Sequence, residues 1–188
     1  MLIMPGQIAP DFEQDTANGS IRLYQWLGRS WGLLFSHQRD LASLYAADLV
    51  AIAALRPALR QRDVKPIGLA RCAAQSHQCW QSRFARTHGY EVGFPLVADA
   101  DGSVCDLYGL PSHEDPDSGP FNLLVIDDQK RVRLVVSHAD RADRAFADIL
   151  LLIDRMRRGN GAARIATGQV PLPAKNLSAG QVPMTETC

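Results

Sequence analysis

The chain has 188 residues, of which 46% are hydrophobic and 21% are charged, and this composition suits one soluble globular domain with a full core. Twenty basic residues balance twenty acidic ones, so the charge gives no sign of a nucleic-acid or membrane-surface partner. Residues 1–5 are too short for the apolar part of a signal peptide, and no apolar run approaches membrane-spanning length.

Four cysteines occur, and they form neither a CxxC pair nor a regular metal-binding spacing. They are Cys72, Cys79, Cys105 and Cys188. No histidine pattern adds a metal site. We therefore expect free thiols in a reducing, cytoplasmic setting, with no metal and no cofactor.

The first half of the chain predicts a hairpin and then a strand followed by a long helix. Asn18-Gly19 is a hairpin turn signal, and a short strand and a helical turn should follow it. The apolar run 31–35 is typical of a strand buried on both faces, and 36–40 reads as a polar turn. Apolar residues then recur at helical spacing to Leu59, and Pro57 should kink this helix or start a new turn. In α/β proteins, chemistry gathers at the carboxyl end of such a strand.

The second half alternates strands and helices. Gly109 is expected to end a short helix as its C′ residue, and 112–119 should be a surface loop. The expected strands are 64–70, 94–97, 121–126 and 131–137, and the expected helices are 73–88, 104–108 and the segment ending near 158.

The segment after the central strand carries a specific resemblance. Phe35-Ser36-His37, Arg39-Asp40 and Asp48-Leu49 lie in the same frame as FSHPRDFTPVCTTEL, the active-site segment of one-cysteine (1-Cys) peroxiredoxins of the AhpC/TSA family. Further matches are the APDF motif at 9–12, and segments 64–70, 94–99, 106–110 and 144–150. The resemblance covers about residues 6–158 and implies a thioredoxin-like α/β fold, with a mixed central sheet and helices on both faces.

The same resemblance implies a degenerate peroxidatic site. The family's threonine, cysteine and arginine positions are occupied by Ala42, Tyr45 and Phe121, and a phenol cannot replace the peroxide-cleaving thiolate. Together with His37 and Arg144, these residues would line the former pocket. Tyr45 either packs inward and fills that pocket or has a function of its own. The favoured role is a pseudoenzyme that binds a small ligand or a protein partner.

Two rival functions remain open. One is an antioxidant thiol peroxidase or oxidoreductase that uses a displaced cysteine, chiefly Cys72. This residue follows a buried strand and precedes a helix, whose N-terminus would lower the thiol pKa. Cys79 lies two helical turns later, about 10 Å away, too far for a disulfide without local unfolding. The other rival is a non-redox enzyme built on His37, Tyr45 and Arg144.

Two expectations concern organisation. Residues 1–158 should form the peroxiredoxin-like domain, and 159–188 should be a truncated, mostly irregular C-terminal arm, because glycines and prolines replace large apolar residues there. The resemblance also implies a homodimer formed by the edge strand 131–137. His77 and Trp80, which match the family's HxxW spacing, are expected to have a packing role.

Overall fold

The computed structural model describes residues 3–37, 43–70, 73–89, 91–110, 121–138 and 143–159. In this part of the chain, seven strands form one mixed sheet in the order β2-β1-β5-β4-β3-β6-β7. The strands are β1 (Glu13–Thr16), β2 (Gly19–Arg22), β3 (Trp31–His37), β4 (Val64–Ala70), β5 (Leu96–Ala98), β6 (Phe121–Ile126) and β7 (Val132–His138). The helices are α1 (Leu23–Leu27), α2 (Ser43–Gln61), α3 (Ala74–His88), α4 (Ser103–Tyr108) and α5 (Asp143–Arg158).

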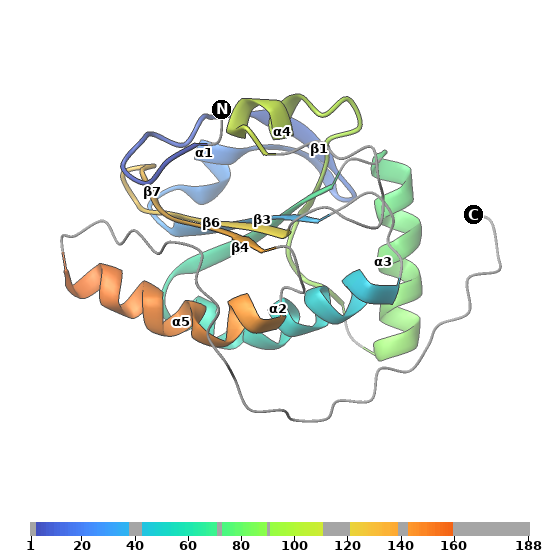
Figure 1. Ribbon diagram of the computed structural model, residues 1–188. Coiled ribbons are helices and arrows are strands. Elements are labelled where there is room, and N and C mark those ends of the chain that lie inside the picture. Colours follow the sequence, from blue (N-terminus) through green and yellow to red (C-terminus); the bar gives the residue numbers. More distant parts are fainter. Residues whose placement is uncertain are drawn as a thin grey trace.

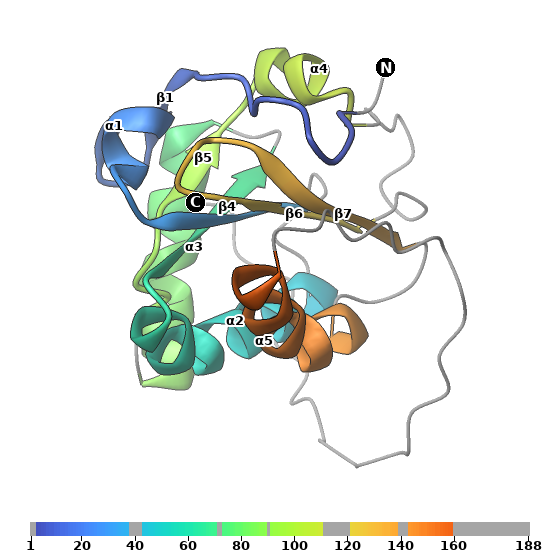
Figure 2. The same cartoon turned by 90° about the vertical axis from the view of Figure 1, so that its left-hand side faces the viewer.

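Helices cover both faces of the sheet. Figure 1 shows α2 and α5 side by side below the sheet and α1 and α4 above it, and Figure 2 shows the same layers after a quarter turn. Each face has its own apolar core: one contains Phe35 and Ile52, the other Leu34 and Tyr108. This architecture is the thioredoxin-like fold that the sequence predicts.

The central strand β3 is two residues longer than the apolar run predicts. Leu33, Leu34 and Phe35 are buried, as expected of a strand with a core on each face. The expected polar turn at 36 is wrong, because Ser36 and His37 still pair in parallel with β4. Available backbone partners on the neighbouring strand therefore outweigh the polarity of these two side chains.

Helix α2 continues through Pro57 and ends at Gln61, so the prediction of a new turn near this proline is wrong. Leu49, Ile52 and Leu59, on either side of the proline, are fully or almost fully buried. This packing holds both halves of the helix against the sheet, and it outweighs the one backbone hydrogen bond that the proline removes.

Two turn predictions are confirmed by backbone geometry. Gly19, with φ of +109°, ends the turn between β1 and β2, and the two strands pair antiparallel. Gly109 follows α4 in the left-handed region, with φ of +63°. No helix among the described residues is long and apolar enough to span a bilayer. Residues 160–188, most of the expected C-terminal arm, lie outside the described residues.

Candidate functional site

One end of the sheet brings together the segments that the sequence marks as chemical. β3 and β4 both end there, with His37 opposite Ala70 in parallel register. β6 begins at the same end, since Asn122 pairs with Ser36, and β7 ends there, with His138 opposite Phe121. We call this end of the sheet, where β3 and β4 have their carboxyl ends, the active edge. Ligands of α/β folds bind at the carboxyl ends of such strands.

Helix N-termini also gather at the active edge. α2 begins six residues after His37, and α3 begins four residues after Ala70. α5 lies alongside α2 in the same direction, since Arg62 just beyond the end of α2 binds Asp154 near the end of α5 (Figure 1). The partial positive charge of helix N-termini stabilises anions, including thiolates.

The predicted pocket residues are placed by their backbones only. His37 ends β3, Tyr45 lies in the first turn of α2, Phe121 begins β6 and Arg144 lies in the first turn of α5. The positions of their side chains are outside what the structure describes, and so are Ala42 and Cys72 altogether. The fold thus brings the segments that carry these residues to one end of the sheet, as the resemblance implies.

Buried polar side chains join two strands at the active edge. Asn122 is only 2% exposed, and its Nδ2 donates a hydrogen bond of 3.2 Å to Oγ of Ser36, which is also buried. Such a side-chain bond in the interior fixes the relative position of β3 and β6. The ends of these two strands therefore form a rigid base beneath the active edge.

His77 and Trp80 have packing roles, as expected. His77 is fully buried, and its Nδ1 lies 3.0 Å from the carbonyl oxygen of Leu96. Because a carbonyl only accepts, Nδ1 carries the proton. Burial lowers the pKa of His77, so the ring is neutral near pH 7. Trp80 packs against Phe84 with ring centroids 5.0 Å apart.

The two cysteines that the structure describes lie in different environments. Cys105, on α4, is buried in the core and forms no disulfide. Cys79 lies on α3, is partly buried and is disulfide-bonded, so the expectation that all thiols are free is wrong for this residue. Among the described residues, no group of three or more His, Cys, Asp or Glu side chains could hold a metal ion.

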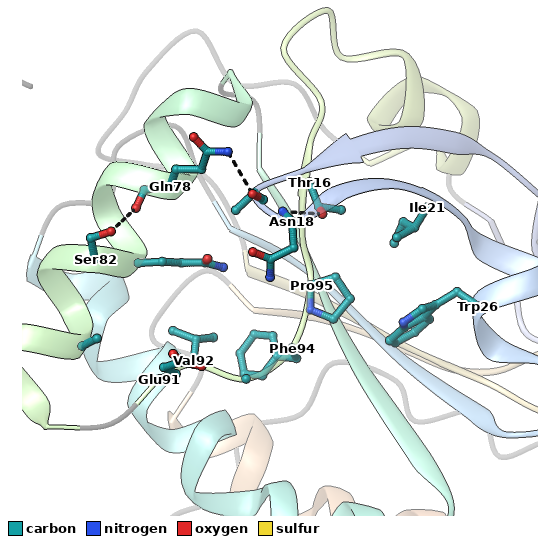
Figure 3. Close-up of a pocket in the computed structure, with 14 residues that line it drawn as sticks. Thr16, Asn18, Ile21, Trp26, Gln78, Ser82, Glu91, Val92, Phe94 and Pro95 are labelled. Atoms are coloured by element: carbon teal, nitrogen blue, oxygen red, sulfur yellow. Dashed lines mark hydrogen bonds between the residues drawn. The ribbon is translucent and has the colours of Figure 1, made fainter.

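A groove of about 700 Å³ lies between the β1–β2 turn, α3 and the connection that leads to β5 (Figure 3). Its hydrogen-bonding side chains include Asn18, Gln78, Gln81 and Ser82, and Glu91 is the charged residue that lines it. Apolar contact comes from Ile21, Trp26, Val92, Phe94 and Pro95. Gln78 donates a hydrogen bond of 2.9 Å to the carbonyl of Ala17, which fixes the turn against the helix.

The sequence analysis missed this groove. One signal could have found it: positions 78, 81, 82 and 85 follow the i, i+3, i+4, i+7 spacing of a single helix face, and all four are polar or small. A helix face of this kind, next to a hairpin turn, leaves room between the two elements.

Comparison with known proteins agrees with the architecture. Residues 5–135 match the AhpC/TSA family model. A 1-Cys peroxiredoxin of Dictyostelium discoideum is 32% identical over 151 residues, covering 79% of this chain and 62% of that protein. Peroxiredoxin-6 of Gallus gallus is 31% identical over 164 residues, covering 82% of this chain and 73% of that protein. The chain spans about three fifths of the length of the first of these relatives.

Solved structures give the same result. The structure of the yeast mitochondrial 1-Cys peroxiredoxin superposes with a TM-score of 0.76 at 30% identity, covering 84% of this chain and 78% of that one. Peroxiredoxin 6 of Arenicola marina superposes with a TM-score of 0.72 at 28% identity, covering 82% and 74%. The family match, the sequence identity and the fold agree: the chain belongs to the AhpC/TSA family of peroxiredoxins.

Proposed function

We propose that this protein is a thiol-dependent oxidoreductase that reduces hydroperoxides with a cysteine displaced from α2, chiefly Cys72. No cysteine occurs before position 72, so the first turn of α2 offers Tyr45 instead of a thiol. Thiol chemistry, if the chain retains that of its 1-Cys relatives, must therefore come from a residue on another segment.

The observation that carries this proposal is the register of the two central strands. Ala70 is opposite His37 at the active edge, and Cys72 follows Ala70 by two residues. Helix α3 begins at Ala74, and its N-cap residue, Ala73, provides no side-chain hydrogen bond to the helix. A thiolate just before this uncapped N-terminus would be stabilised by the helix dipole, which favours a lowered pKa for Cys72.

The proposed reaction is balanced in two steps. The Cys72 thiolate attacks the distal oxygen of a hydroperoxide, the O–O bond breaks, and after protonation an alcohol leaves while the sulfur becomes a sulfenic acid. An external thiol then attacks the sulfenic sulfur and releases water. A second external thiol restores the Cys72 thiol and leaves as a disulfide.

The main alternative is a binding protein on the same scaffold. It is favoured by the residues at the positions that the family uses for peroxide, Ala42, Tyr45 and Phe121, none of which can supply a thiolate or a cation. In this case the former pocket would hold a small ligand or a protein partner, and peroxide turnover would stay at background.

Peroxide turnover with a thiol reductant separates the two functions. We expect turnover by the parent protein, and a loss of roughly tenfold or more in kcat/KM for Cys72→Ser. Cys105→Ser is the matched control, because its thiol is buried in the core, and it should keep the parent rate once its folding is verified. Background turnover in the parent, or full activity in Cys72→Ser, would contradict the assignment of Cys72.

We also propose a homodimer formed through β7. The N-terminal segment covers the start of this strand, since Val132 N donates a hydrogen bond of 2.9 Å to the carbonyl of Gln7. Beyond that point, β7 is an edge of the described sheet, and such an edge tends to be paired or protected. Sedimentation at micromolar concentration should show a dimer; a monomer alone would refute this arrangement.

A further inference from the structure

The groove beside α3 combines hydrogen-bonding side chains with an aromatic wall. Its volume of about 700 Å³ falls within the range of small-ligand sites, about 300–1,000 Å³. The described lining includes three amides, a serine hydroxyl, a carboxylate and an indole ring, from Asn18, Gln78, Gln81, Ser82, Glu91 and Trp26. We propose that this groove binds a short, neutral carbohydrate. The proposal is independent of any peroxide chemistry at Cys72.

The charge of the lining decides the charge of the ligand. Among the described lining residues, Glu91 is the only one with an ionisable side chain, and it is exposed. Two cations contact lining residues without lining the groove themselves: Lys65 lies over the Trp26 ring, and Arg56 packs against Gly93. Like charges repel, so a carboxylate in the groove disfavours ligands that carry phosphate, sulfate or carboxylate groups. A neutral ligand is therefore favoured over a nucleotide or an acidic sugar.

Three lining side chains have free hydrogen-bonding groups. In the part of the chain that the structure describes, the side chains of Asn18, Gln81 and Glu91 form no hydrogen bond. An amide donates and accepts, whereas a carboxylate only accepts. A hydroxyl group donates to the carboxylate and both donates to and accepts from the amides, so a ligand with several hydroxyls satisfies all three side chains. A peptide N–H only donates and a peptide carbonyl only accepts, so each meets part of this set.

Trp26 provides an apolar surface for the C–H face of a sugar ring. Lys65 Nζ lies 5.4 Å from the centre of the indole ring and donates a hydrogen bond of 2.6 Å to the Trp26 carbonyl oxygen, which holds this residue in place. Because the cation occupies one face of the ring, the ligand would contact the other. Figure 3 shows Asn18 and Pro95 between α3 and Trp26. A ligand that reaches both walls must therefore be extended, which favours more than one sugar ring.

The walls of the groove are held in place without a ligand. Gln78 Nε2 donates a hydrogen bond of 2.9 Å to the carbonyl of Ala17 and so ties the β1–β2 turn to α3. Thr16 Oγ1 donates a hydrogen bond of 2.7 Å to the carbonyl of Gly19 and accepts one of 3.1 Å from the backbone N–H of Asn18. These bonds fix the turn that carries the Asn18 side chain. Binding then requires little further ordering of the protein, which favours affinity.

Saturation-transfer NMR with defined sugars tests the ligand class. The neutral probes are maltose, cellobiose, lactose and N,N′-diacetylchitobiose at millimolar concentration, and the anionic probes are sialyllactose and a sulfated heparin disaccharide. We expect saturable binding of at least one neutral sugar, and anionic probes that bind at least tenfold more weakly than the best neutral one. Absence of binding by all four neutral sugars, or equal binding of an anionic probe, would overturn the proposal.

Variants locate the bound sugar. Gln81→Ala should weaken binding of the best neutral probe by about three- to tenfold, the value of one neutral hydrogen bond. Glu91→Gln should weaken it roughly fivefold, since a carboxylate accepts a stronger hydrogen bond than an amide. Ser82→Trp fills the groove and should abolish binding. Gln75→Trp, exposed on the same helix but outside the groove, is the matched control. With folding verified by circular dichroism, equal binding by the two tryptophan variants would show that the sugar does not use the groove.

Discussion

Replacement of Asp99 by alanine should destabilise the protein strongly. This carboxylate is fully buried directly after β5, at the end of the FP-x-x-AD motif. It accepts hydrogen bonds of 2.9 Å from the backbone N–H groups of Val104 and Cys105, in the first turn of α4. Ser103 Oγ lies 3.4 Å from the same carboxylate. Asp99 therefore caps α4 from inside the core.

The magnitude follows from the donors that the substitution leaves behind. Val104 and Cys105 are buried, so water cannot replace the lost acceptor. A buried N–H without an acceptor costs about 1–3 kcal/mol, so Asp99→Ala should lower the free energy of unfolding by about 2–6 kcal/mol. For a domain of this size, at about 2–4 °C per kcal/mol, the corresponding loss in Tm is roughly 4–24 °C. Asp99→Asn should lose about half as much, because its amide oxygen still accepts one of the two bonds.

Thermal and urea unfolding followed by circular dichroism measure these losses. Asp101→Asn is the matched control: Asp101 is exposed and accepts one backbone hydrogen bond, of 3.1 Å from Ser103, so its change should be much smaller. If Asp99→Ala unfolds within 2 °C of Asp101→Asn, an error margin well inside the difference expected from two buried donors, then Asp99 does not cap α4 in solution and the reasoning is refuted.

Two further predictions concern a buried histidine, His77, and two glycines with positive φ, Gly93 and Gly89. The unfolded state binds a proton at His77 near pH 6.5, whereas burial lowers the pKa in the folded state, so stability is full above pH 6.5 and falls as the pH drops towards the folded pKa. The loss in the free energy of unfolding should be at most about 1.4 kcal/mol per pH unit. It should be absent in His77→Asn, which keeps a donor for Leu96. If urea titrations show the same fall in unfolding free energy from pH 7 to 5 in the parent and in His77→Asn, this prediction is contradicted. Gly93, with φ of +69°, packs against the Arg56 guanidinium, whereas Gly89, with φ of +73°, has open space around its Cβ position. Gly93→Ala should therefore cost more than Gly89→Ala, for which backbone strain alone gives about 1–2 kcal/mol, and the excess should vanish in an Arg56→Ala background.

Much of the fold could be predicted from local patterns. The run 31–35 is apolar without alternation, so as a strand it presents apolar side chains to both faces of the sheet, which indicates a central strand. Asn18-Gly19 predicted the position of the first hairpin. The errors arose where tertiary contacts decide. Ser36 and His37 look like turn residues until β4 provides their backbone partners, and Pro57 looks like a helix break until the burial of Leu59 is known.

The candidate site was only partly predictable. The resemblance to FSHPRD and the positions of Phe121 and Arg144 predicted which segments meet, and the sheet register brings the backbones of these segments to one end. The groove could not be predicted in the same way, because its lining comes from a hairpin turn, a helix face and a connection far apart in sequence. The cap made by Asp99 has the same origin: the motif is visible in the sequence, but its backbone partners appear only in the fold.

The rate of oxidation at each cysteine tests the central claim most directly. The protein is first reduced, which frees Cys79 from its disulfide. A short exposure to substoichiometric peroxide, with a sulfenic-acid trap and mass spectrometry, then measures all four cysteines in one sample. We predict that Cys72 acquires the label first, roughly tenfold or more faster than free cysteine, because the N-terminus of α3 favours its thiolate. Labelling of all four cysteines at or below the rate of free cysteine would contradict a thiol peroxidase.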